Sequence, residues 1–125
     1  MAKSILVVDD DQSLRELLRL HLSSAGYEVR TAADGIEAGY SVLKDPPDLI
    51  ITDVNMPHMN GYEFVGALRS DDKVRAIPVI FLTSMDEVDR GKALGAVGYI
   101  TKPVRADVLL ATVAQHLPGG TYPIG

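Results

Sequence analysis

Short apolar segments recur along the chain, and they restrict its fold more than any other feature of the sequence. Four of them are strand-length runs, mostly rich in β-branched residues, at residues 5–8, 49–51, 79–82 and 99–100. Because these runs are continuous rather than alternating, both faces of each strand should be covered, which is typical of a parallel sheet between two layers of helices. Residues 27–31 alternate Glu28 and Arg30 with apolar neighbours, which predicts a fifth strand at a sheet edge.

Segments with the helical period alternate with these strands. They cover residues 12–25, 35–44, 62–69, 86–94 and 105–117. The first carries an apolar stripe that includes Leu17 and Leu18, begins near Asp11 and ends at Gly26. The last should turn Val108 towards the core.

Strand and helix alternate five times, which predicts an α/β fold with right-handed crossovers and helices on both faces of a parallel sheet. For five strands we expect a flavodoxin-like, doubly wound sheet with strand order 2-1-3-4-5. In that order the first and third strands are neighbours and the order reverses between them. Their carboxyl ends should therefore form the crevice in which such folds bind ligands.

Composition limits the remaining possibilities. With 125 residues the chain suits one domain, which we expect at residues 1–117, followed by a tail or truncated linker at residues 118–125. A net charge of -5 and the lack of a Lys/Arg cluster argue against direct nucleic-acid binding. The chain has no cysteine and no apolar run long enough for a signal peptide or a membrane span, so we expect a cytoplasmic protein that does not bind membranes.

Unusual polar residues stand at the carboxyl ends of the expected strands. They are Asp9, Asp10, Asp53, Thr83 and Lys102. Several carboxylates in one crevice repel each other, and a divalent cation relieves this repulsion. Hard oxygen ligands without thiolates or a histidine pair favour Mg²⁺. A lysine and a hydroxyl beside such a cluster suit phosphoryl transfer, with Asp53 as the natural nucleophile. Asp11 is more simply explained as a helix cap.

The chain resembles the receiver domain of two-component response regulators, in particular the chemotaxis-regulator type. Five ordered motifs carry the resemblance: Val7-Val8-Asp9-Asp10, Ile51-Thr52-Asp53-Val54-Asn55-Met56-Pro57, Gly61, Leu82-Thr83-Ser84 and Tyr99-Ile100-Thr101-Lys102-Pro103. Each motif is common alone, but the ordered set is specific and spans about residues 4–117.

The resemblance implies a role for each matching residue. Asp53 would be the phosphoacceptor, with Thr83 and Lys102 contacting the phosphoryl group. Mg²⁺ would be held by four residues: Asp9, Asp10, Asp53 and the backbone carbonyl of Asn55. Tyr99 would be an aromatic switch that follows Thr83, and Pro103 would follow a cis peptide bond.

The resemblance also implies partners. The phosphoryl donor would be a sensor histidine kinase or a phosphotransfer protein, and the domain would act as a switch rather than as a turnover enzyme. The output surface would comprise the fourth helix, the fifth strand and the fifth helix, with homodimerisation as one possible readout. The interval from Thr83 to Lys102 is about one helical turn shorter than is usual for the family, so we expect an unusual fourth helix.

Other classes of protein fit the sequence less well. A phosphatase of the haloacid dehalogenase type would use Asp9 as its nucleophile, within the Asp-x-Asp spacing of residues 9–11, but it leaves Asp53 unexplained. A flavodoxin-like electron carrier needs a hydroxyl- and glycine-rich phosphate loop where this chain has three aspartates. A receiver without chemistry, acting only as an interaction module, is disfavoured because Asp10, Asp53, Thr83 and Lys102 are all present.

Overall fold

The computed structural model describes residues 2–56, 59–83 and 95–117. The elements follow one another in the order β1 (Ser4–Val8), α1 (Gln12–Ser24), β2 (Glu28–Ala32), α2 (Gly35–Lys44), β3 (Leu49–Asp53), α3 (Gly61–Arg69), β4 (Val79–Thr83), β5 (Gly98–Thr101) and α5 (Ala106–His116). The helix predicted over residues 86–94 and the tail predicted at residues 118–125 lie outside the described residues.

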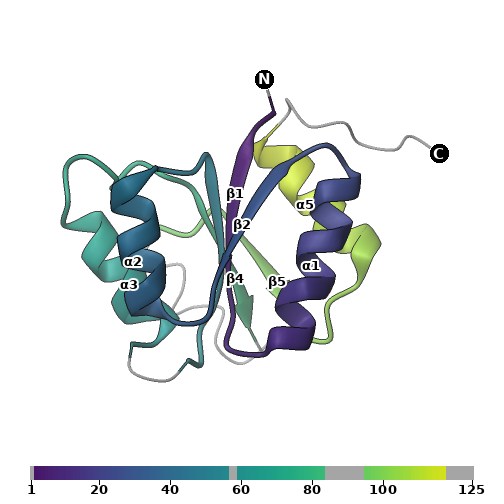
Figure 1. Cartoon of the computed structure of the whole chain (residues 1–125), viewed down its shortest axis with the longest axis horizontal. Coiled ribbons are helices and arrows are strands. Elements are labelled where there is room, and N and C mark those ends of the chain that lie inside the picture. Colours follow the sequence, from purple (N-terminus) through teal and green to yellow (C-terminus); the bar gives the residue numbers. More distant parts are fainter. Residues whose placement is uncertain (1, 57–58, 84–94, 118–125) are drawn as a thin grey trace.

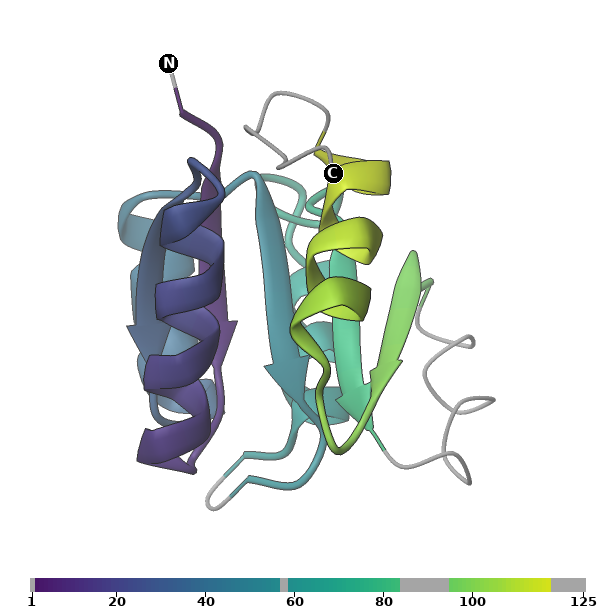
Figure 2. The same ribbon diagram turned by 90° about the vertical axis from the view of Figure 1, so that its right-hand side faces the viewer.

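The five strands form one parallel sheet in the order β2-β1-β3-β4-β5. Helices α2 and α3 cover one face of this sheet, and α1 and α5 cover the other (Figure 1). The view in Figure 2 shows α1 and α5 in front of the sheet, with the strand arrows running in one direction. The predicted doubly wound fold and its strand order are confirmed.

Burial of the strands follows the pattern predicted from their composition. All five residues of β3 and all five of β4 are buried, as expected for continuous apolar runs in the middle of a parallel sheet. Strand β2 begins with an exposed residue, continues with three half-buried ones and lies at the sheet edge. The prediction of an edge strand with alternating charges is confirmed.

Two apolar layers make up the core, one on each face of the sheet. In β1, Leu6 and Val8 pack into the layer that includes Phe64 of α3, whereas Ile5 and Val7 pack into the layer shared with α1 and α5. This division follows from the alternation of side chains along a strand. Because both layers are apolar, a charged side chain within them would be costly, and the acidic residues of the crevice lie at the ends of the strands.

The prediction that Leu17 and Val108 face the core is wrong. Leu17 is 47% exposed to solvent and Val108 is 41% exposed. Helix α1 buries Leu18 and Leu22, which are four residues apart, and α5 buries Leu109. Each helix contacts the sheet along a single narrow stripe, and a neighbouring position is turned about 100° away from that stripe. An apolar residue beside the stripe therefore faces solvent.

Helix α3 begins unusually close to the end of β3. A Cβ atom at Gly61 would lie 2.2 Å from the carbonyl oxygen of Asp53 and 2.9 Å from Cα of Val54. The Gly61 amide donates to the carbonyl of Val54 at 3.0 Å. No side chain fits at this position. Glycine therefore allows the start of α3 to lie this close to the backbone of Asp53.

We expect Gly61→Ala to destabilise the fold by about 1–3 kcal/mol, because the added methyl group overlaps backbone atoms that have no alternative position. Gly66→Ala in the same helix is the matched control, since a Cβ there meets nothing within 4 Å. This control should be stabilising by about 0.5–1 kcal/mol, because alanine has the higher helix propensity. Urea unfolding of both variants measures the difference, and equal free energies of unfolding would contradict the close approach.

Candidate functional site

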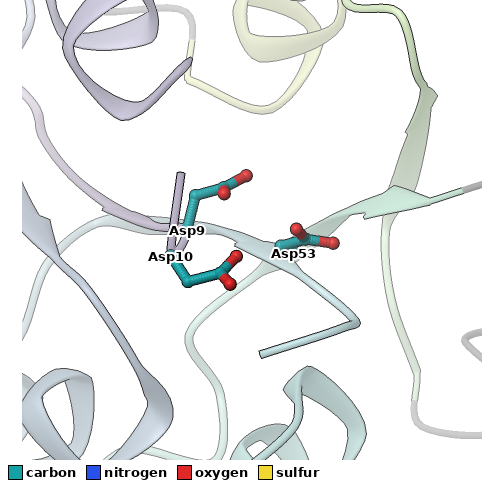
Figure 3. Close-up of side chains that lie close together, drawn as sticks. All are labelled: Asp9, Asp10 and Asp53. Atoms are coloured by element: carbon teal, nitrogen blue, oxygen red, sulfur yellow. The ribbon is translucent and has the colours of Figure 1, made fainter. Parts of the chain in front are cut away.

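The polar residues predicted from the sequence meet at the carboxyl edge of the sheet. Asp9 follows β1, Asp53 ends β3, Thr83 ends β4 and Lys102 follows β5. The Lys102 amide donates to the carbonyl of Thr83 at 3.1 Å, which extends the pairing of β4 and β5 by one step. Figure 3 shows the carboxylates of Asp9, Asp10 and Asp53 gathered on the same side of these strand ends.

Asp9 is a fully buried carboxyl group. Its Oδ1 accepts from the Asp11 amide at 2.9 Å, and its Oδ2 is buried without a hydrogen-bond partner among the described residues. Lys102 Nζ lies 3.6 Å from that oxygen. Burial raises the pKa of Asp9, and the negative charges of Asp53 and Asp10 raise it further. The hydrogen bond from the Asp11 amide and the charge of Lys102 lower this pKa but do not cancel the rise. Ionised Asp9 is therefore an under-satisfied anion that a cation would stabilise.

Asp53 and Lys102 form a short ion pair in the crevice. Lys102 Nζ donates to Asp53 Oδ2 at 2.6 Å, and the Asn55 amide donates to Asp53 Oδ1 at 3.3 Å. The Asp53 side chain is 5% exposed, whereas that of Lys102 is 36% exposed. Burial alone would lower the pKa of Lys102, but the hydrogen bond and charge of Asp53, with the charge of Asp9, raise it. Lys102 is therefore held as a cation.

One carboxylate oxygen from each of Asp9, Asp10 and Asp53 lies within 4.8 Å of the others. The donors are all oxygens, and the cluster contains three acids against one lysine. Within the described part of the chain, Asp9 Oδ2 has no hydrogen bond. This set fits a hard divalent cation such as Mg²⁺, which prefers a few carboxylates and retains several water molecules. Asp10 is exposed, so the cluster is open to solvent on one side.

Thr83 and Tyr99 lie on the same face of neighbouring strands. Thr83 is buried at the end of β4 and pairs with Thr101, while Tyr99 pairs with Phe81 two residues earlier. Because side chains alternate along a strand, Thr83 and Phe81 share a face with Tyr99 and Thr101. Tyr99 is half-buried and packs against the apolar layer beneath α2 and α3. The peptide bond between Lys102 and Pro103 is cis.

Two contacts near the site were not predicted from the sequence, although Gly61 itself is one of the motifs that carry the resemblance. Arg15 Nη1 donates to the carbonyl oxygen of Asp9 at 2.7 Å, and Gly61 touches the backbone of Asp53. Nothing in the sequence predicts that the side chain of an arginine in the first turns of a helix contacts the end of the preceding strand. Asp11, in contrast, accepts from the amides of Ser13 and Leu14 and caps α1, as predicted.

An apolar groove of about 340 Å³ lies elsewhere, between α2 and α3, and is lined by Ile36, Tyr40 and Leu43 among others. None of the predicted site residues borders it. The acid-rich crevice is therefore identified by its chemistry and its place in the sheet, not by the presence of a deep hollow. Fold and crevice together define a doubly wound α/β protein with an oxygen-donor cluster at its topological switch point.

Comparison with known proteins agrees with this class. The family model described as "Response regulator receiver domain" matches residues 5–114. The chain belongs to this family, and it is therefore a receiver domain of two-component signalling.

Individual relatives show the same relationship. The transcriptional regulatory protein GltR of Pseudomonas aeruginosa is 40% identical over 118 residues, which are 92% of this chain and 49% of that protein. The response regulator MprA of Mycobacterium bovis is 43% identical over 122 residues, which are 94% of this chain and 51% of that protein. The chain thus spans about half the length of these curated relatives.

Among solved structures, the chemotaxis response regulator CheY4 of Vibrio cholerae superposes with a TM-score of 0.87 at 42% identity, and the match covers 92% of this chain and 98% of that one. These comparisons give no support to the haloacid dehalogenase alternative. In the structure, the carboxyl group that such an enzyme would use as its nucleophile, Asp9, is fully buried.

The raised pKa of Asp9 predicts how the metal-free protein responds to pH. A folded-state pKa above the unfolded value makes the native state lose stability as pH rises through that folded pKa. Asp9→Asn should therefore increase the free energy of unfolding at pH 7 by about 1 kcal/mol, a usual size for one residue. The gain should disappear below the ordinary pKa of an aspartate, where wild-type Asp9 is also neutral.

Urea unfolding at several pH values in the presence of a chelator measures this effect. Asp11→Asn is the control, because asparagine caps a helix as well as aspartate does and Asp11 is exposed. An Asp9→Asn variant that is less stable than wild type at pH 7 would contradict the electrostatic account of the crevice.

Proposed function

We propose that the chain is a Mg²⁺-dependent phosphoryl acceptor in which Asp53 takes the phosphoryl group. The observation that carries this proposal is the contact of 2.6 Å between Lys102 and a nearly buried Asp53, beside two further carboxylates. A nucleophile, a fixed cation and a cluster of acids in one crevice are the groups that phosphoryl transfer requires.

In the transfer step an oxygen of the Asp53 carboxylate attacks phosphorus, and a new P–O bond forms. The bond from phosphorus to the donor breaks, which is a P–N bond when the donor is a phosphohistidine of a sensor kinase or phosphotransfer protein. The bonding electron pair leaves with the donor nitrogen. Lys102 would stay beside the phosphoryl oxygens and offset their charge, and the hydroxyl of Thr83 would donate a hydrogen bond to one of them.

Asp9, Asp10, Asp53 and the backbone carbonyl of Asn55 would hold Mg²⁺, which when bound neutralises charge on the carboxylates and on the incoming phosphoryl group. Two features support this assignment: the mutual approach of the three carboxylates, and the Asp9 oxygen that has no hydrogen bond to any residue that the structure describes. Without a cation, the crevice would repel a phosphate. Asp53 would be phosphorylated once, and water would later hydrolyse the acyl phosphate to phosphate and the free carboxylate, so the domain would be a switch rather than a turnover enzyme.

The output of the switch would be carried by β5, α5 and the segment before them. Thr83 turning towards a phosphoryl group would vacate space on the face that it shares with Tyr99, whose ring could then move inward. The surface formed by the fourth helix, β5 and α5 would bind a partner or a second copy of the chain. Because the interval from Thr83 to Lys102 is about one helical turn shorter than is usual for the family, the geometry of a dimer formed through this surface would differ from that of other receivers.

The chain's own net charge of -5 supports a domain that does not itself contact nucleic acid, and a cytoplasmic location is the usual one for the family. A relative that spans twice this length is named as a transcriptional regulator. DNA contact would therefore belong to a further domain in any longer protein that carries this receiver. Among the described residues, no helix is both long and apolar enough to cross a bilayer.

Incubation with a small acyl phosphate should add one phosphoryl group to the wild-type chain in the presence of Mg²⁺ and none when Mg²⁺ is chelated. Asp53→Asn should abolish the adduct, because the asparagine amide is not nucleophilic enough to attack the phosphorus of the donor. Asp11→Asn is the matched control and should be labelled like wild type. Intact-mass analysis detects the adduct, and equal labelling of wild type and Asp53→Asn would refute the assignment.

The switch can be tested by backbone NMR with and without a phosphoryl mimic. Shifts should extend from the loops around Asp53 into β5 and α5. Thr83→Ala should move the equilibrium about tenfold towards the unmodified state, because a hydrogen bond to a charged group contributes about 1.5–3 kcal/mol. Thr83→Ser retains the hydroxyl and should behave like wild type. Shifts confined to the loops around Asp53 in the wild-type protein would rule out this switch.

A further inference from the structure

Arg15 reaches back from α1 to the end of β1. Its Nη1 donates to the carbonyl oxygen of Asp9 at 2.7 Å, and its own backbone amide donates to the carbonyl oxygen of Asp11 at 2.9 Å. One residue thus holds two of the three carbonyl groups in the acidic loop, residues 9–11, and Asp10 lies between them. The side-chain contact is short, as is usual when the donor is charged.

The other contacts of the acidic loop hold its two flanking residues but not Asp10. The Asp9 amide donates to the carbonyl of Ala32 at 3.1 Å, and Asp9 Oδ1 accepts from the Asp11 amide. Asp11 is held by its capping bonds to α1. In the ranges 2–56, 59–83 and 95–117, no residue forms a hydrogen bond or an ion pair with the Asp10 carboxylate. Its place in the cluster with Asp9 and Asp53 therefore depends on the backbone that carries it.

We propose that Arg15 is a positioning residue for the Mg²⁺ site: by fixing the Asp9 carbonyl, it sets the orientation of the Asp9–Asp10 peptide and aims the Asp10 carboxylate at Asp53. This inference rests on the proposed Mg²⁺-dependent function and deepens it. Residues that orient the direct ligands of a metal commonly contribute strongly to metal affinity, although they never touch the ion.

The direction in which Mg²⁺ affinity changes when Arg15 is neutralised distinguishes a positioning role from a purely electrostatic one. Arg15 is a cation close to a site for a cation, so removing its charge should by itself strengthen Mg²⁺ binding. Loss of the hydrogen bond to the Asp9 carbonyl acts in the opposite direction, because Asp10 is then free to leave the cluster. A weaker affinity in the neutral variant can therefore be attributed only to the lost hydrogen bond.

The experiment is a Mg²⁺ titration of the full chain, followed by the amide NMR signals of the acidic loop, with no phosphoryl donor present. Arg15→Met removes the donor and keeps the aliphatic stem, and it should weaken binding about tenfold, the lower end for such orienting contacts. Arg15→Lys keeps a charged donor on a flexible stem and should stay within about threefold of wild type. Urea unfolding and the metal-free spectrum establish that each variant is folded.

Arg19→Met is the matched control. It lies on the same helix and removes the same charge, but its guanidinium pairs with Glu16 and not with the acidic loop. Its Mg²⁺ affinity should equal that of wild type. Unchanged or tighter binding in Arg15→Met, equal weakening in Arg19→Met, or no recovery in Arg15→Lys would each overturn the role of Arg15. Absence of Mg²⁺ binding in the wild-type chain would instead overturn the proposed function itself.

Discussion

Repulsion between carboxylates at one edge of the sheet is the constraint on which the rest of the site depends. Asp9, Asp10 and Asp53 approach one another within 4.8 Å, and Lys102 is the cation that touches two of them. A lysine offsets only part of three negative charges, and the buried Oδ2 of Asp9 is left without a hydrogen bond among the described residues. The crevice is thus poised to take up positive charge, and a cation bound there would remove the repulsion that an arriving phosphoryl group would otherwise meet.

Such an arrangement costs stability, and the rest of the fold has to tolerate that cost. It does so because β3 and β4 are wholly buried and the two apolar layers hold the strands from both faces. Asp53 is further fixed from the backbone side, where the start of α3 approaches so closely that only a glycine fits at position 61. The Asp53 carboxylate is therefore presented by a buried strand whose end is closely packed against the start of α3, which is favourable for a group whose geometry would decide the chemistry.

The ion pair between Lys102 and Asp53 offers a physical route from the site to the proposed output surface. Lys102 follows β5 and contacts Asp53 at the end of β3, so the pair spans β4 and ties the two strands together at their carboxyl ends. A phosphoryl group on Asp53 would compete for Lys102 and for the hydroxyl of Thr83 at once. Thr83 ends β4 and Lys102 follows β5, and Tyr99 lies on the face that these two strands share. A local change of charge would thereby be converted into a change of packing.

The sequence by itself determined the order and type of the elements, the parallel sheet, the edge position of β2 and the convergence of the acids with Lys102. These follow from local pattern, since continuous apolar runs require two covered faces and the carboxyl ends of parallel strands share one edge. Only the tertiary structure decided how far each group is buried and what holds it. Four features depend on how a helix sits against a strand end: the exposure of Leu17 and Val108, the Asp9 oxygen that has no hydrogen bond among the described residues, the contact of Gly61 with Asp53, and the bond from Arg15 to the Asp9 carbonyl. Periodicity identifies the face of a helix that packs, but contacts of a few ångströms are fixed by the packing of the whole chain.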